Sequence, residues 1–488
     1  MRVSTLNFTR KAKKFRTIIS LILFFFGISA IHGQGFEMEL YLPTASGNFV
    51  KLTYYYGRNI YVKDSILIDN QGIGTLKYDT LLPQGIYKIY FDPESHFDFL
   101  LGKNQKLKIS NPGFDSAKLT IDGAIESIEF QKYLAWIAIQ QQEKQKMEMQ
   151  RKEAPEKEQQ KIDKQIATLN KDVIDYWQKK SKQYPGSFLG AFLMSNYFAD
   201  LKMEDVPQEI ADDDSLLWHY QYNYRKDHFF DYYDLTDARF LYTPSLKSKL
   251  DTYFEKVLLQ TYDSIKPAAY RLIEKVKPTP SMYRFVLSYL INSSLNSHIM
   301  GLDALFVDLA DDFYLSGEAA WADSVTLEKI RENKIFIENN LIGKTARDFK
   351  MKTNLGDDFR LYTQTADYLI VVFYEPNCSH CREFVPLLHN DIYLPFRDKG
   401  VGVVAVNSIA IRDDWDDFIE EYDLHDWHNV WDEHHISRFR VDYDVRMTPK
   451  TYLLDKNKKI VAKKCSIEFL KQVLPILLGE SDYSSGGH

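Results

Sequence analysis

Cysteine is scarce in this sequence, with three residues in a chain of 488. A secreted protein stabilised mainly by disulfides needs many more cysteines, and a structural zinc site usually needs four ligands. Neither disulfides nor a cysteine-based zinc site therefore explains the stability of this chain. A basic surplus is also missing, because 61 Lys and Arg residues stand against 68 Asp and Glu residues, for a formal net charge of −7. This balance argues against a general nucleic-acid-binding protein, which normally carries excess positive charge.

The longest apolar run lies at the N-terminus, and no second run of membrane-spanning length follows it. Residues 17–31 form an apolar stretch that ends in small and polar residues and that follows six basic residues, Arg2, Arg10, Lys11, Lys13, Lys14 and Arg16. This pattern is typical of a secretory signal peptide, and the stretch is shorter than the roughly 20 residues of a membrane-spanning helix. We therefore expect residues 1–34 to be a signal peptide and the mature chain to work in the periplasm or cell envelope. An uncleaved N-terminal anchor is the alternative and would be the only attachment to a membrane.

The rest of the chain has a globular composition, 45% hydrophobic and 26% charged, and is longer than one core usually spans. Residues 35–125 show the alternation of a β-strand, for example at Phe36, Met38, Leu40 and Leu42, and turn residues separate the runs. We expect a β-sandwich-like domain there, with no catalytic constellation.

Helical patterns follow the β region. Residues 126–183 are rich in Glu, Lys and Gln, with apolar residues at helical spacing and an interruption at Pro155, which predicts two helices in a charged connector. A dimerising coiled coil is the alternative reading of this connector. Residues 184–338 predict an α-helical domain, in which Pro278 and Pro280 precede an apolar face from Met282 to Leu290.

Strand and helix patterns alternate in residues 339–480, and residues 481–488 read as a disordered tail. Four strands are expected at 368–374, 401–406, 451–454 and 459–463, with helices at 414–421 and 467–478. The predicted fold class is multidomain α+β: an N-terminal β-sandwich-like domain, a central α-helical domain and a C-terminal α/β domain.

The first expected strand of this region runs directly into Cys378-Ser379-His380-Cys381. A helix that begins at the first cysteine presents unpaired N–H groups and a partial positive charge, which stabilise a thiolate there. The second cysteine then lies one turn further on, within reach of a mixed disulfide formed by the first. Protonated His380 would add to the stabilisation of the Cys378 thiolate, and a stabilised reduced form makes the disulfide more oxidising.

These residues, followed by Pro386, resemble the active site of thioredoxin-fold proteins. Thr448-Pro449, just ahead of an expected strand, resembles the cis-proline loop of that family, which holds substrate backbone. Residues 341–349 resemble the entry segment of the TlpA/ResA-like extracytoplasmic thiol–disulfide oxidoreductases. The resemblance covers roughly 339–480 and implies a C-terminal thioredoxin-like fold; the preceding β and helical regions look like the uncharacterised N-terminal domains of such envelope proteins.

Two positions depart from the thioredoxin pattern. Val372 and Asn377 stand where thioredoxins carry a buried aspartate and a tryptophan, so the usual proton acceptor for Cys381 is missing. Glu375 is either a substitute acceptor or a solvated loop carboxylate.

The cysteines have alternative interpretations as metal ligands or as a haem attachment site. A zinc site would need ligands beyond Cys465, and only the histidine-rich stretch with His425, His428, His434, His435 and Asp432 could supply them. Haem attachment would need a histidine where Arg382 stands. Cys465, which has no visible partner, reads as a buried small hydrophobe.

The sequence thus predicts a thiol–disulfide oxidoreductase with Cys378 as nucleophile, Cys381 as resolving thiol and His380 as tuning residue, while the resemblance implies Thr448 and Pro449 as the substrate-backbone contact. No cofactor is expected, because the cysteines carry the two electrons. The expected partners are thiols and disulfides of envelope proteins and a membrane or periplasmic redox donor. The alternatives are an envelope scaffold whose thioredoxin-like module serves for docking and, as a third reading, metal delivery.

Overall fold

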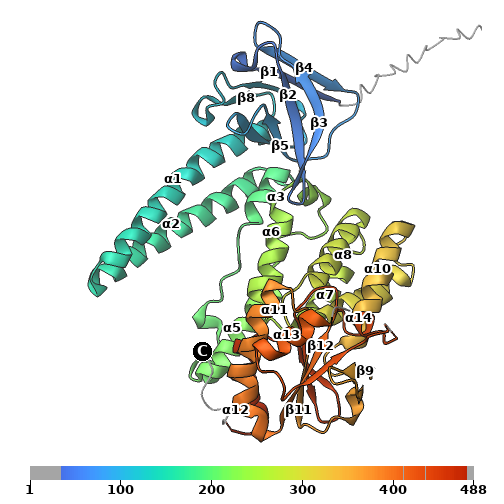
Figure 1. Cartoon of the computed structure of the whole chain (residues 1–488). Coiled ribbons are helices and arrows are strands. Elements are labelled where there is room, and N and C mark those ends of the chain that lie inside the picture. Colours follow the sequence, from blue (N-terminus) through green and yellow to red (C-terminus); the bar gives the residue numbers. More distant parts are fainter. Residues whose placement is uncertain (1–34, 410–411, 435, 481–488) are drawn as a thin grey trace, which may run out of the picture.

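The computed structural model describes residues 35–480 except 410, 411 and 435. Figure 1 shows a β domain, a helical part and a C-terminal α/β domain that follow one another along the chain. The signal peptide and the tail predicted for residues 1–34 and 481–488 lie outside the described residues. Within the described part, no helix has the length and apolar character needed to cross a membrane.

The β domain is a sandwich of two four-stranded sheets, with strand orders β4-β1-β7-β8 and β3-β2-β5-β6. Every second residue of β1 is buried, because successive side chains of a strand point to opposite faces. Both sheets contribute to one apolar core, for example Met38 and Phe99. The strands are β1 (Phe36–Tyr41), β2 (Phe49–Tyr56), β3 (Asn59–Leu67), β4 (Ile73–Tyr78), β5 (Gly85–Tyr90), β6 (His96–Leu101), β7 (Lys106–Ser110) and β8 (Thr120–Asp122).

The connector is a hairpin of two long helices, α1 (Ile125–Glu153) and α2 (Glu156–Gln183). Pro155 caps the start of α2 and separates the helices, as its missing N–H and fixed backbone angle predict. The rings of Trp136 and Tyr176 stack across the hairpin with centroids 4.3 Å apart. Both rings also pack against the apolar core of the helical part, so this end of the hairpin is joined to the next domain.

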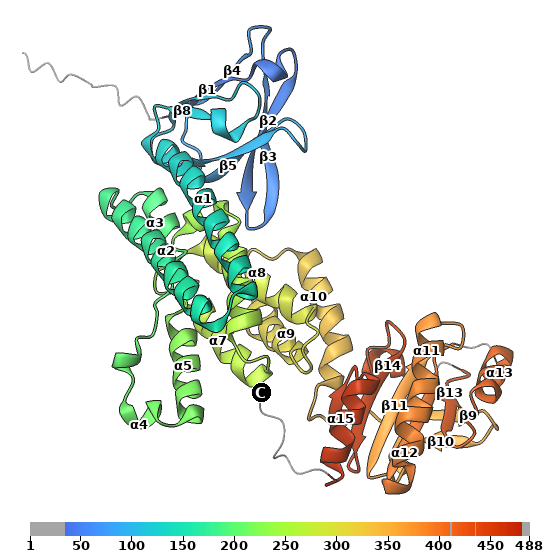
Figure 2. The same cartoon turned by 90° about the vertical axis from the view of Figure 1, so that its left-hand side faces the viewer.

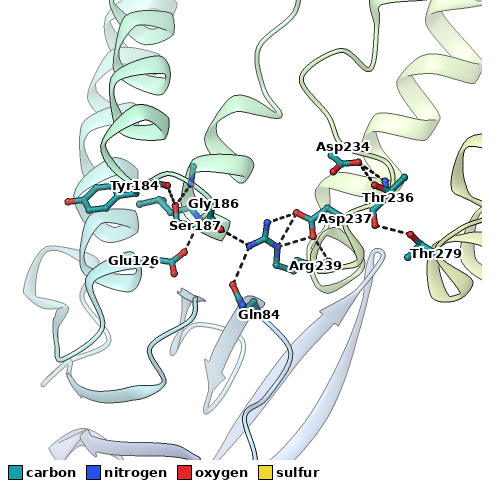
Figure 3. A network of polar contacts seen from close by, with 12 residues as sticks. Gln84, Glu126, Tyr184, Gly186, Ser187, Asp234, Thr236, Asp237, Arg239 and Thr279 are labelled. Atoms are coloured by element: carbon teal, nitrogen blue, oxygen red, sulfur yellow. Dashed lines mark hydrogen bonds and ion pairs between the residues drawn. The ribbon is translucent and has the colours of Figure 1, made fainter. Parts of the chain in front are cut away.

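A polar network joins the β domain, the hairpin and the helical part (Figure 3). The guanidinium of Arg239 donates to the Gln84 side chain and to the Gly186 carbonyl, each at 3.4 Å. Glu126, near the start of α1, accepts a hydrogen bond of 3.0 Å from the backbone N–H of Leu189. Because these residues come from all three segments, the network fixes how the segments meet.

The helical part has eight α-helices, and six of them, α3 and α6 to α10, contribute buried residues to one large apolar core. Pro280 is the first residue of α8, and Met282, Val286 and Leu290 are fully buried along its predicted apolar face. The helices are α3 (Phe188–Met194), α4 (Gln208–Ala211), α5 (Asp214–His228), α6 (Ser245–Thr252), α7 (Tyr262–Val276), α8 (Pro280–Leu295), α9 (Asp303–Leu309) and α10 (Ser324–Ile337).

The C-terminal domain has a seven-stranded sheet of order β10-β9-β13-β12-β11-β14-β15. The interior strand β11 pairs parallel with β12 and antiparallel with β14, and apolar clusters cover both of its faces. The strands are β9 (Lys350–Thr353), β10 (Asp358–Arg360), β11 (Tyr368–Tyr374), β12 (Val401–Asn407), β13 (His428–Trp431), β14 (Lys450–Asp455) and β15 (Ile460–Lys463). The helices are α11 (Ser379–Leu387), α12 (Leu394–Phe396), α13 (Asp413–Glu421), α14 (Phe439–Asp442) and α15 (Ile467–Leu477).

The sequence prediction of four strands in this domain was incomplete. It located β11, β12, β14 and β15, but β9, β10 and β13 are three or four residues long and too short to show a clear alternation. The predicted three-part fold class is confirmed, with β sheets first, helices in the middle and the α/β sheet last. The end of β11, an interior strand of this last sheet, leads within a few residues to Cys378 and Cys381.

Candidate active site

The chain leaves the sheet at the end of β11 and enters helix α11 within a few residues. Cys378 is the N-cap of α11 with an extended backbone (φ −83°, ψ 122°), and its carbonyl accepts the first hydrogen bond of the helix, 3.0 Å from the N–H of Arg382. Cys381 lies one turn further on and is fully buried. The helix start therefore presents free N–H groups beside one partly exposed and one buried thiol.

The Cys378 thiol faces the loop that precedes β14. Its sulfur lies 3.7 Å from the carbonyl oxygen of Thr448, and the Thr448–Pro449 peptide bond is cis. The structure thus brings together Cys378, Cys381 and the Thr448-Pro449 loop, which are separated by about 70 residues in the sequence.

The two thiols have opposite displacements of pKa. Burial alone would raise the pKa of Cys378. Hydrogen bonds from the N–H and thiol of Cys381, from the side chain of Thr448 and from the N–H of His380 favour the thiolate, and they leave the pKa below its usual value. Burial raises the pKa of Cys381 to about 12, and the neighbouring Cys378 thiol adds to this rise. At neutral pH the proton is therefore more easily lost from Cys378 than from Cys381.

This asymmetry predicts selective alkylation of the reduced protein. Because the thiolate is the nucleophile, a small alkylating reagent is expected to modify Cys378 in the native state, with a half-maximal rate at a pH below the value of about 8.5 for a free thiol. Cys381 and Cys465, both buried and each with a pKa raised to about 12, should react only after unfolding. Mass spectrometry after alkylation across a pH series tests this, and modification of Cys381 or Cys465 before Cys378 would contradict it.

His380 contributes to the site through its backbone. Its N–H is among the groups that lower the pKa of Cys378, whereas its side chain is exposed and forms no hydrogen bond within the described part of the chain. The tuning role assigned to its imidazole therefore stays a prediction.

The buried surroundings of Cys381 include two residues for which the sequence predicted only a strand and a helix and no part in the site. Tyr374, the last residue of β11, and Trp415 of α13 are both fully buried, and the Trp415 indole N–H donates to the Tyr374 hydroxyl at 2.8 Å. Burial raises the pKa of Tyr374, with a contribution from the nearby Cys381. The signal that could have pointed to the Trp415–Tyr374 pair is a tryptophan within a mostly acidic helix.

The two positions that depart from the thioredoxin pattern have different surroundings. Val372 is buried at the position where thioredoxins carry an aspartate. Asn377, at the position of the thioredoxin tryptophan, donates a side-chain hydrogen bond to Asp414 at 2.6 Å.

Cys465 is buried as the sequence predicted, with 3% of its surface exposed. It lies in the same apolar cluster as Cys381, and its carbonyl accepts a hydrogen bond of 3.0 Å from Thr451. Its thiol is a packing group in this position.

The histidine-rich stretch does not converge on a metal-binding geometry in the part of the chain that the structure describes, where no cluster of three or more His, Cys, Asp or Glu could hold a metal ion. His428 lies on β13 with its ring against Phe359, and the Asp432 carboxylate accepts from the backbone of Ile436 and Ser437. His435 lies outside the described residues.

Comparison with known proteins gives matches to thiol–disulfide proteins. Residues 342–463 match the AhpC/TSA family. A domain of a possible thiol–disulfide isomerase from Cytophaga hutchinsonii is 36% identical, with coverage of 28% of this chain and 92% of that chain and a TM-score of 0.27. The thioredoxin domain of a thiol–disulfide oxidoreductase from Bacteroides vulgatus is 26% identical, with coverage of 28% and 97% and a TM-score of 0.27. A thiol:disulfide interchange protein from Bacteroides sp. is 26% identical, with coverage of 31% and 97% and a TM-score of 0.27. No curated protein matches the chain.

Proposed function

Because the C-terminal domain of this chain belongs to the thioredoxin-like AhpC/TSA family, we propose that the protein is a thiol–disulfide oxidoreductase whose reacting groups are Cys378 and Cys381. The observation that carries this proposal is the asymmetry of the two thiols. One thiol at a helix start has a lowered pKa and is partly exposed, and the other, one turn away, is buried with a raised pKa. This arrangement suits a nucleophile followed by a resolving thiol.

In the reducing direction, the Cys378 thiolate attacks one sulfur of a substrate disulfide. A mixed disulfide forms between Cys378 and that sulfur, and the other substrate sulfur leaves as a thiolate and takes up a proton. Cys381 then loses its proton and attacks the Cys378 sulfur, which releases the second substrate thiol and leaves a Cys378–Cys381 disulfide. The substrate gains two electrons and two protons, and the protein loses them. The oxidising direction is the reverse of these steps.

The Thr448-Pro449 loop is the proposed contact with substrate backbone. Its support is position, because the Thr448 carbonyl lies beside the Cys378 sulfur, and a peptide that presents a disulfide to Cys378 must pass this loop. Met447, just before the loop, has 81% of its surface exposed and extends the accessible apolar surface at the site.

The cellular setting is likewise a proposal. We place the protein outside the cytoplasm, in the periplasm or cell envelope, on the strength of the signal-peptide pattern in residues 1–34. Its partners there would be envelope proteins with thiols or disulfides, together with a membrane or periplasmic redox protein that restores the spent form of the cysteine pair.

A redox titration of the purified protein tests the proposed function. In buffers of graded ratios of reduced to oxidised glutathione, Cys378 and Cys381 should convert between two thiols and one intramolecular disulfide in a two-electron transition. Mass spectrometry after acid quenching and alkylation measures the two forms, with Cys465 as an internal thiol that stays reduced. Absence of a Cys378–Cys381 disulfide across the whole series would contradict the proposal.

A further inference from the structure

The loop beside Cys378 makes a second contact, with the helical part of the chain. Arg446, which directly precedes Met447-Thr448-Pro449, donates through Nη1 to the side-chain oxygen of Asn333 at 2.8 Å. Its guanidinium also lies over the ring of Phe336, 4.7 Å from the ring centre. Asn333 and Phe336 belong to α10, the last helix of the helical part, which lies on the side of that part that faces the C-terminal domain (Figure 2).

Both ends of the loop are tied to one carboxylate. Asp444 accepts from Nε of Arg446 at 2.5 Å and from Nζ of Lys450, the residue directly after the loop, at 2.9 Å. The Asp444 and Lys450 side chains are 15% and 12% exposed, so solvent screens this pair weakly. Arg446 thus links the Asp444–Lys450 pair to α10.

A buried polar joint lies next to this contact and fixes the same two domains. Lys463 of β15 is 2% exposed, forms an ion pair with Asp303 at the start of α9, and donates to the carbonyl of Asn340 at 2.9 Å. The side-chain amide of Asn340 donates in turn to the backbone carbonyl of Asp442 at 3.2 Å. Asp442 lies two residues before Asp444 in the sequence. Substitution of either charged partner would leave the other charge buried and unpaired, so this joint tolerates little change in the way the two domains meet.

We propose that α10 is a positioning element of the redox site: through Asn333, Phe336 and Arg446 it holds the Met447–Pro449 loop at the distance from Cys378 that a substrate peptide requires. The inference rests on the proposed function and extends it, because it gives the helical part a task in substrate binding. Arg446 and Asn333 are positioning residues, since they reach the reacting sulfur only through the loop.

Arg446→Met removes the guanidinium and keeps much of the apolar stem. For reduction of a protein disulfide, kcat/KM should fall about tenfold, mainly through a higher KM, because a displaced loop weakens the hold on substrate backbone. The rate with a small disulfide reagent, which does not need the loop, should stay within about twofold of the unmodified protein. Arg397→Met is the matched control, because Arg397 is also 43% exposed and ion-paired, with Asp426 at 2.8 Å, but away from the loop.

The partner variant Asn333→Ala lies in the helical part and should give the same KM effect. In the double variant Arg446→Met/Asn333→Ala the loss should be no larger than that of the stronger single variant, because both remove one contact. Thermal unfolding of each variant separates loss of positioning from loss of folding, and Asn333→Ala carries the test if Arg446→Met fails to fold.

Three results would overturn the inference: equal effects of Arg446→Met and Arg397→Met, an equal loss with the small reagent, or fully additive effects in the double variant. These are distinguishable from failure of the proposed function. If the unmodified protein and Cys378→Ser reduce the protein disulfide at the same rate, the function fails; if only the unmodified protein is active and the α10 variants match it, the positioning role alone fails.

Discussion

Replacement of Cys378 by serine is expected to lower the rate of protein disulfide reduction at least about a thousandfold, to the rate of the buffer reductant alone. A serine hydroxyl does not ionise near neutral pH and cannot form a disulfide, so the first step has no nucleophile. No other thiol takes its place, because Cys381 and Cys465 are 0% and 3% exposed and burial raises the pKa of each to about 12. The measurement is the initial rate of reduction of a protein disulfide with the variant and the unmodified protein at equal concentration.

Cys465→Ala is the control for this prediction. It removes a thiol of similar burial from the same apolar cluster without touching the helix start, so its rate should stay close to that of the unmodified protein. Activity that survives in Cys378→Ser and disappears in Cys465→Ala would make Cys465 the required thiol and contradict the proposed mechanism.

Replacement of Cys381 by serine is expected to stop multiple turnover and to cause the mixed disulfide between Cys378 and the substrate to accumulate. Cys378 can still attack a substrate disulfide, but the second step lacks its thiol, so the mixed disulfide persists and multiple turnover stops. The covalent adduct should approach one per protein molecule on non-reducing gels, whereas the unmodified protein should show little. The double variant Cys378→Ser/Cys381→Ser should form none.

This second prediction also separates the oxidoreductase from the envelope scaffold weighed as its alternative. A module that serves only for docking would bind partners without a covalent bond, and reducing agent would not affect the complex. A complex that dissociates on addition of reductant requires a disulfide between the two proteins.

The residues of the proposed site could be picked out from the sequence because their signals are local. Cys378 and Cys381 follow a strand whose continuous apolar run reflects burial on both faces, and Thr448-Pro449 precedes another buried strand. The predicted roles of these residues stay predictions until the variants are measured. The imidazole of His380 was assigned a tuning role on proximity in the sequence, yet its side chain points to solvent and only its N–H reaches the thiol.

The surroundings of the site could not be predicted because they depend on contacts between distant residues. The hydrogen bond from Arg446 to Asn333 spans 113 residues, and the one from Trp415 to Tyr374 spans 41. A single arginine and a single asparagine have no periodicity that would pair them, and exposed arginines are common on any surface. Short strands such as β13 were missed for a related reason: sheet neighbours stabilise them more than their own sequence pattern does.

Cys378 is the thiol proposed to join the substrate, and the site of attachment in the trapped adduct shows whether it does so. Cys381→Ser is incubated with a protein disulfide, quenched with acid, digested without reductant and analysed by mass spectrometry. The substrate peptide is expected to be linked to the peptide that contains Cys378. Linkage to Cys465, or no linked peptide at all, would contradict it.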